Sequence, residues 1–96
     1  MNEKNLAALY ESNENIRRLL ETEWANRFTS LQLAEIRRGL EQDVDVSVYA
    51  IASFGDTQMR WIRKHIQRKL DFRKYALPSI SGEYICEEFH KTIRRY

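Results

Sequence analysis

Apolar residues recur at helical spacing in two stretches near the middle of the chain, 26 positions apart. Separations of three and four residues bring such side chains onto one face of an α-helix. The first stripe consists of Leu33, Ile36, Leu40 and Val44, and the second of Met59, Ile62, Ile66 and Leu70. We therefore predict two amphipathic helices of about three turns each.

Each stripe is preceded by residues that are typical of a helix N-terminus. Thr29 and Ser30 come before the first stripe, and Gln32 stands where a capping box has its side-chain acceptor. Asp56, directly after Gly55, gives the corresponding signal before the second stripe. We predict that the two helices begin at these residues.

The stretch after the first stripe permits two interpretations. Residues 43–48 (DVDVSV) alternate like a β-strand, but Val48 corresponds to Lys74 in the second stretch, where the alternation is lost. Both stretches share an aspartate, Asp45 or Asp71, that can cap a helical turn. The apolar residues that follow are Val46, Tyr49 and Ala50 in one stretch and Phe72, Tyr75 and Ala76 in the other. We predict a short helix after each long one.

The two stretches are related over their whole length. Residues 28–50 align without gaps on residues 54–76, and seven of the 23 pairs are identical. Composition alone would give about one or two identities, which indicates an internal duplication. We interpret each copy as a long helix followed by a short helix, in the manner of an α-solenoid.

Helices are also expected on both sides of the duplicated region. Apolar residues between positions 6 and 24 keep helical spacing, although residues 12–15 (SNEN) could cap a new helix and divide this one. Pro78 ends the second copy, and Ser79 or Ser81 can cap a final helix. The apolar stripe of that final helix consists of Ile85, Phe89, Ile93 and Tyr96.

Together these elements predict one compact all-α domain, a helical array in which flanking helices close the duplicated units. Its parts are an N-terminal helical cap (1–27), repeat unit 1 (28–53), repeat unit 2 (54–77) and a C-terminal helix (78–96). The 96 residues are 43% apolar and 31% charged, which suits a globular protein. The single cysteine fits a reducing compartment, and neither a membrane span nor a signal peptide is evident. We expect a soluble cytoplasmic protein.

The first copy contains the pattern Q-L-x-x-I-R-x-G-L-E at residues 32–41, followed by D-V-S-x-Y-A at residues 45–50. This pattern resembles short helical repeats in uncharacterised proteins of conjugative elements and phages of Gram-positive bacteria. The second copy departs from the pattern at His65, Gln67 and Arg73. The resemblance covers residues 28–76 and implies an accessory protein of a mobile genetic element, with no catalytic residues to carry over.

Charge is distributed unevenly along the chain. Residues 1–56 contain six basic and ten acidic side chains, whereas residues 57–96 contain ten basic and four acidic ones. Most of the basic excess lies in residues 60–74. Such asymmetry indicates either a surface for an anionic partner or a solvated face that balances the acidic half of the same fold.

Basic residues and a tryptophan share the helix face opposite the second stripe. The candidate partner-binding residues are Arg60, Trp61, Lys64, His65, Arg68 and Arg73. A tryptophan among cations can hold unpaired nucleotides by stacking on bases, while the cations contact phosphates. Trp61 can also pack on a neighbouring unit, although the first copy has Glu35 at this position. We expect this face to bind an unidentified protein partner, with nucleic acid as the alternative.

Enzyme chemistry finds little support in the sequence. Cys86 and His90 have a spacing that can place two ligands on one metal ion, but a zinc site would also need His65 and a carboxylate such as Glu87. A Cys–His nucleophile pair would lack an oxyanion hole. The three glycines stand alone, so no phosphate-binding loop is expected. We expect a non-enzymatic protein without metal or cofactor.

Overall fold

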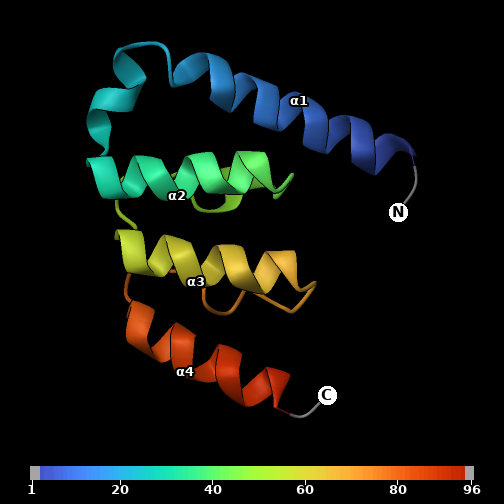
Figure 1. Ribbon diagram of the computed structural model, residues 1–96, viewed down its shortest axis with the longest axis vertical. Helices are drawn as coiled ribbons and strands as arrows, with labels where there is room; N and C mark the ends of the chain where they lie inside the picture. The colour runs from blue at the N-terminus through green and yellow to red at the C-terminus, as the bar shows by residue number, and fades with distance from the viewer. Residues whose placement is uncertain (1–2, 95–96) are drawn as a thin grey trace.

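Figure 1 shows the computed structural model of the protein, which describes residues 3–94 and, from residue 8 onwards, their side chains. The elements within this range are α1 (Glu3–Leu19), η1 (Glu23–Arg27), α2 (Ser30–Glu41), η2 (Val46–Val48), α3 (Asp56–Gln67) and α4 (Gly82–Ile93). The predicted all-α class is confirmed, and the described residues include no β-strand. None of the helices in this range has the length and apolar character that crossing a membrane requires.

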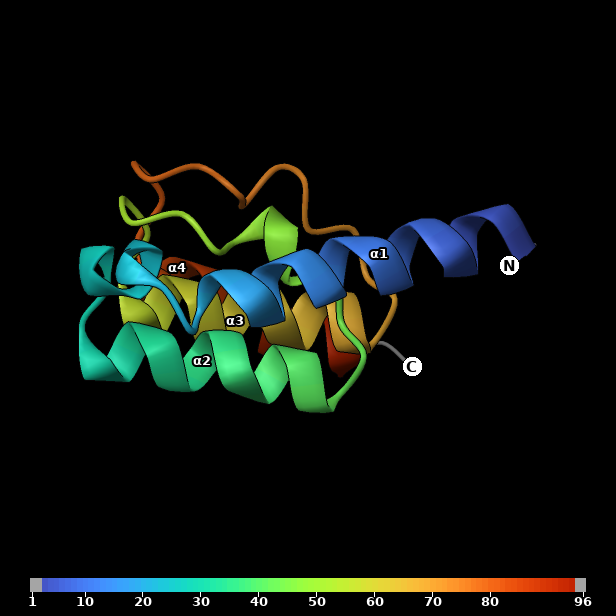
Figure 2. The same cartoon turned by 90° about the horizontal axis from the view of Figure 1, so that it is seen from above.

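Three helices form one layer of the molecule. α2, α3 and α4 lie side by side and run in the same direction, so the chain must return between them. Two connecting segments, residues 42–55 and 68–81, lead the chain back, and we call them the returns. Both run along the same face of the helix layer (Figure 2). The chain therefore winds as a coil, of which residues 28–53 are the first turn and residues 54–79 the second. α1 covers the first turn, where it contacts η2 and η1.

The helices of the layer recur every 26 residues. α2, α3 and α4 have 12 residues each and begin at Ser30, Asp56 and Gly82. Asp43 and Lys69, which follow the first two helices, both adopt a left-handed backbone with φ of 56° and 60°. α4 thus stands where the long helix of a third copy would stand. A common origin of these segments stays a prediction.

A glutamine closes each turn of the coil. Gln32 accepts a hydrogen bond from the Thr29 amide (2.7 Å) and donates to the carbonyls of Ala52 (3.2 Å) and Phe54 (2.7 Å). Gln58 makes the same three contacts 26 positions later, with Gly55, Pro78 and Ile80. Each glutamine therefore ties the start of its helix to the end of the return that follows, an arrangement that we call the glutamine clasp.

The hydrophobic core lies between the helix layer and the returns. The buried members of the two predicted stripes are Ile36, Leu40, Val44, Met59 and Ile62. The other members, at the ends of the stripes, are half-buried. Tyr49 from the first return and Ile85 from α4 are also fully buried. The three helices and the returns therefore contribute to one core.

The two returns differ in their short helices. In the first return, Asp45 accepts a hydrogen bond from the amide two residues on (3.2 Å) and caps η2, as predicted. In the second return, Asp71 makes the same contact at the same distance, but only a hydrogen-bonded turn follows. The prediction of a second short helix is therefore wrong. Val48 packs against the core, whereas Lys74 at the equivalent position is exposed, so less packing stabilises the second segment.

α1 is one continuous helix, so the alternative division at residues 12–15 is wrong. Asn13 lies inside this helix and is buried. Its side-chain amide donates to the carbonyl of Val44 (2.8 Å), and its oxygen accepts from the amide of Val46 (3.3 Å). Tertiary hydrogen bonds of Asn13 to the first return thus replace the local cap that the SNEN stretch suggested.

The flanking helices differ from the prediction at their ends. Trp24 belongs to η1 rather than to α1, which ends before it. α4 begins after Ser81, whose hydroxyl accepts a hydrogen bond from the amide three residues on (3.1 Å), so Ser81 rather than Ser79 is the cap. Leu6 and Tyr96 lie outside the described side chains.

Candidate functional site

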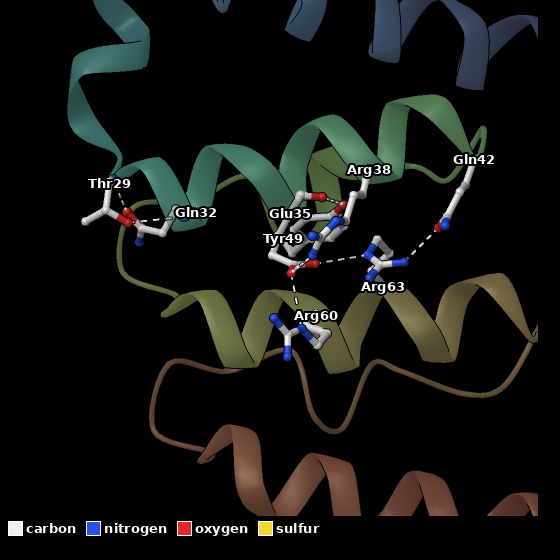
Figure 3. Close-up of polar contacts among 8 residues, drawn as sticks. All are labelled: Thr29, Gln32, Glu35, Arg38, Gln42, Tyr49, Arg60 and Arg63. Atoms are coloured by element: carbon white, nitrogen blue, oxygen red, sulfur yellow. Dashed lines mark hydrogen bonds and ion pairs between the residues drawn. The ribbon is translucent and has the colours of Figure 1, made fainter.

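A buried carboxylate joins α2 to α3. The Glu35 side chain is 2% exposed and accepts hydrogen bonds from three arginines (Figure 3). Its Oε1 accepts from Arg38 (2.7 Å) and Arg60 (3.2 Å), and its Oε2 accepts from Arg63 (3.2 Å). Arg63 also donates to Gln42 at 2.8 Å. Removing one partner of a buried ion pair costs about 3–5 kcal/mol, so this cluster is a structural link between the two helices.

Trp61 occupies the position on α3 that Glu35 occupies on α2, and it packs α3 against α4. The centroid of its ring lies 5.5 Å from that of Phe89 and 5.3 Å from that of His90. The ring is half-buried between the helices. The prediction of Trp61 as an exposed aromatic among cations is therefore wrong, and its alternative role in packing on a neighbouring segment is the one observed.

Two of the predicted cations cover this aromatic contact from outside. The Lys64 ammonium lies 5.5 Å from the centroid of the Trp61 ring, and the Arg68 guanidinium lies 6.0 Å from that of Phe89. At these distances the rings attract the cations through their π-systems. Arg68 remains exposed and Lys64 half-exposed, so both charges are available at the surface.

His65 is buried, so its predicted exposure is wrong. Its Nδ1 lies 2.7 Å from the Trp61 carbonyl oxygen, which can only accept, so Nδ1 carries the proton. The rings of Tyr75 and Phe89 enclose it at 4.9 and 5.3 Å. Its Nε2 has no hydrogen-bond partner among the described residues. Burial, more than any other cause, lowers the pKa of His65 from its ordinary 6.5, so the ring is neutral at pH 7.

The first coil turn satisfies the equivalent carbonyl in another way. Tyr49 donates its hydroxyl to the Glu35 carbonyl at 2.7 Å. This contact requires glycine at position 39, because a Cβ on Gly39 would collide with the Tyr49 hydroxyl. Burial raises the pKa of Tyr49 well above its ordinary value, so the hydroxyl keeps its proton. The second turn has His65 at the position of Gly39. The Nε2 atom of its ring has no hydrogen-bond partner among the described residues.

Some of the surface cations follow one another across the helix layer, on successive helices. We define the basic strip as Arg38, Arg60, Lys64, Arg68 and Arg94. Arg38 and Arg60 are neighbours, since both reach the same oxygen of Glu35, yet their side chains stay 52% and 43% exposed. Lys64 and Arg68 follow one helical turn apart on α3. Arg94 is the C-cap of α4, as Arg68 is of α3.

The sequence prediction missed two members of this strip, Arg38 and Arg94. Arg38 lies in the first copy, outside the basic residues 60–74, and Arg94 lies beyond the aligned region. The signal that could have found both is the spacing of 26, which places Arg38 at the position of Lys64 and Arg94 at that of Arg68. Extending the alignment by one helix would therefore have shown cations at the same positions on successive helices.

Arg73 lies apart from the basic strip. It is exposed on the second return and pairs with Asp71 at 3.4 Å. Figure 2 shows the returns along one face of the helix layer, and the buried stripe residues Met59 and Ile62 lie between that face and the returns, whereas the cations of the strip are at the surface. Of the six predicted site residues, the structure therefore groups Arg60, Trp61, Lys64 and Arg68, buries His65 and separates Arg73.

Cys86 and His90 interact with each other rather than pointing at a shared ligand. The Cys86 Sγ lies 3.6 Å from His90 Nδ1, and Nδ1 also lies 2.9 Å from the Cys86 carbonyl, to which it donates. Within the described part of the chain, no three His, Cys, Asp or Glu side chains are placed to hold one metal ion. The His90 ring packs on Trp61 and so has a structural role.

The basic strip can bind anionic groups. Guanidinium groups form paired hydrogen bonds with carboxylates and phosphates, and ammonium groups add point charges. Comparisons of the chain with protein-family models, with curated proteins and with solved structures give no match. The basic strip, with cations from three successive helices, is the surface feature on which a function can be proposed.

Proposed function

We propose that this protein is a non-enzymatic protein-interaction module that binds an acidic segment of a partner protein along the basic strip. The strip takes cations from α2, α3 and α4, so it extends across the layer instead of forming a single point of charge. Its arginines can each hold a carboxylate with two parallel hydrogen bonds. A run of Asp and Glu side chains is therefore a suitable ligand.

The packing of Trp61 is the observation that favours a protein ligand over a nucleic acid. Proteins that hold single strands usually present free aromatic rings on which bases stack. Trp61 packs against Phe89 and His90 of α4, and Lys64 lies over its ring. The strip therefore offers charge without a stacking platform, which suits carboxylates better than nucleotides.

We further propose that the module serves a mobile genetic element in the bacterial cytoplasm. This part of the proposal is supported by the resemblance of residues 28–76 to helical repeats in proteins of conjugative elements and phages. Helical coils of this kind use extended surfaces to bind other proteins. The partner would then be a protein with an exposed acidic segment.

The proposal is tested by fluorescence anisotropy with a labelled Glu-rich peptide and with a single-stranded oligonucleotide of equal length. The test variant is Lys64→Glu with Arg68→Glu, which reverses two neighbouring charges of the strip. Arg18→Glu, an exposed change on α1, is the control for a charge reversal outside the strip. We expect the peptide to bind, and the double variant to weaken its binding at least about tenfold, because like charges then face the ligand.

Two results would contradict the proposal. Tight binding of the oligonucleotide, falling steeply with salt, would assign the strip to nucleic acid instead. Equal loss of peptide binding in Arg18→Glu and in the double variant would show that net charge rather than the strip decides the affinity.

A further inference from the structure

A hollow of about 250 Å³ lies beside the C-terminal ends of α3 and α4. The second return forms its outer wall with Lys69, Asp71 and Lys74, and Thr92 of α4 lines it from the other side. The ring of His65 also lines this hollow. The Lys74 ammonium lies 5.1 Å from the centroid of the Tyr75 ring. The hollow thus combines two cations with a buried imidazole and with the Asp71 carboxylate, which is paired with Arg73 at 3.4 Å.

The corresponding positions of the first coil turn carry different chemistry. At the positions of His65, Lys69 and Lys74 the first turn has Gly39, Asp43 and Val48, and at the position of Thr92 α3 has Ile66. The coil is therefore built in the first turn without any of these polar groups. Four of the seven residues that line the hollow therefore differ in chemistry from their equivalents, whereas Leu70, Asp71 and Tyr75 match Val44, Asp45 and Tyr49. The four changed residues are the basis for asking what the hollow binds.

Hydrogen bonds fix what the hollow can offer a ligand. His65 Nδ1 donates to the Trp61 carbonyl, so Nε2 of the neutral ring is an acceptor without a donor. The Thr92 hydroxyl donates to the Glu88 carbonyl at 2.8 Å, so its oxygen is likewise left to accept. A ligand that fits must bring negative charge for the lysines and a proton for these acceptors.

We propose that this hollow binds inorganic phosphate, held by Lys69 and Lys74 through its charged oxygens and by His65 Nε2 through its P–OH group. Inorganic phosphate keeps at least one proton at neutral pH, whereas sulfate keeps none. The acceptor on His65 therefore selects phosphate over sulfate, although both are tetrahedral anions that lysines attract equally. Because no residue of the basic strip lines the hollow, this site stands independently of the proposed protein ligand.

Phosphate reaches Nε2 by a small displacement of the second return. The atom itself has no accessible surface, so the wall over it must shift. Residues 70–72 of this wall have no regular secondary structure, which makes the movement local. Binding should therefore be reported by the backbone amides of the second return.

Titration of the ¹⁵N-labelled protein with inorganic phosphate, monitored by amide and imidazole NMR signals, tests the site. We expect saturable shifts of the amides from Lys69 to Tyr75 and of the His65 ring, with a dissociation constant on the order of 1 mM. Sulfate at equal ionic strength should bind at least about tenfold more weakly, since it brings no proton for Nε2.

Two variants separate the roles of the ring and the lysines. His65→Asn keeps a donor toward the Trp61 carbonyl but lacks Nε2, and it should lose the preference for phosphate over sulfate. Lys69→Ala should weaken the binding of both anions. Arg37→Ala, an exposed change on α2, is the control and should leave both affinities unchanged.

The proposal is overturned by any of three results. The first is that no saturable shift occurs in the second return, and the second is that phosphate and sulfate bind equally to the wild-type protein. The third is that a phosphate monoester binds more tightly than the free ion, which would assign the hollow to a phosphorylated molecule. If His65→Asn fails to fold, the phosphate-to-sulfate ratio of the wild-type protein still decides the question.

Discussion

Single residues decide how each turn of the coil uses the same backbone positions. Glu35 and Trp61 stand at equivalent positions, but the first makes an ionic link to the next helix and the second an aromatic one. Gly39 and His65 also stand at equivalent positions. Gly39 leaves room for the Tyr49 hydroxyl, whereas the ring of His65 fills the corresponding space and packs against Tyr75. The chemistry of a turn therefore depends on a few side chains and not on its backbone.

Gly39 should be required in spite of its place inside a helix. Alanine in a helix interior is normally more stable than glycine by about 1 kcal/mol. Here the added Cβ would collide with the Tyr49 hydroxyl, so we expect Gly39→Ala to lower the free energy of unfolding by about 1–3 kcal/mol. Urea denaturation measures this change.

Gly55→Ser is the matched control for this measurement. Its Cβ would meet only Gln58 Oε1, at 3.5 Å, and serine is a good helix cap. The free energy of unfolding should therefore stay within a few tenths of a kcal/mol of the wild-type value. A stable Gly39→Ala variant would show that Tyr49 does not need the space above position 39.

At the scale of elements, hydrogen bonds from two of its side chains link α1 to the coil. The buried Asn13 amide bonds to both the carbonyl of Val44 and the amide of Val46. Arg17 adds a bond to the Leu40 carbonyl at 3.2 Å. The Val44 carbonyl and the Val46 amide have no other hydrogen-bond partner in the described part of the chain, so α1 closes the coil by hydrogen bonding as well as by packing.

Replacing Asn13 should therefore loosen α1 selectively. We expect Asn13→Ala to destabilise the protein by about 2 kcal/mol, because two buried backbone groups lose their partner. Hydrogen exchange should become faster in α1 and around Val46, and change less in α4. Asn15→Ala, an exposed change in the same helix, is the control. Equal acceleration in both variants would contradict this role.

The sequence predicts elements well where the signal is local. Thr29 and Gln32 mark the start of α2 within four residues, so the cap could be read without the fold. The orientation of Trp61 depends on Phe89, which lies 28 positions away and has no counterpart in the first copy. α4 escaped the alignment because the position of Ile36 and Ile62 is occupied by Glu88. α4 has the same length as α2 and α3 and begins 26 positions after α3, but it lacks the residue identities on which an alignment depends.

The whole molecule is a coil in which each turn packs only on its neighbours. α2 contacts α3 and α3 contacts α4, while the returns pass behind them. His65 connects these parts, since its ring lies on α3 and packs against Tyr75 of the second return and Phe89 of α4. Protonation of this ring would place a charge in a buried position where three segments meet, and Asp71 and Glu88 offset its cost only in part.

Stability should therefore fall as the solution becomes acidic. The pKa of His65 in the folded state lies below the 6.5 of the unfolded state, so the unfolded chain binds a proton that the folded one does not. The contribution of neutral His65 is present above pH 6.5 and is lost as the pH decreases below that value.

Urea denaturation at about pH 7.5 and about pH 5.5 measures this effect. We expect the wild-type protein to lose more stability between the two conditions than His65→Asn, which has no imidazole to protonate. Equal losses in the two proteins would exclude His65 as the source of the pH dependence.

The glutamine clasp has a genetic consequence. Gln32 and Gln58 reach carbonyls 20 and 22 positions downstream, so the length of each return is fixed by the side chain that closes it. Insertion or deletion of 26 codons would add or remove a full winding and leave every clasp intact. A deletion of any other length within a return would pull the carbonyls away from the glutamine, so we expect viable shortened chains to lack 26 residues.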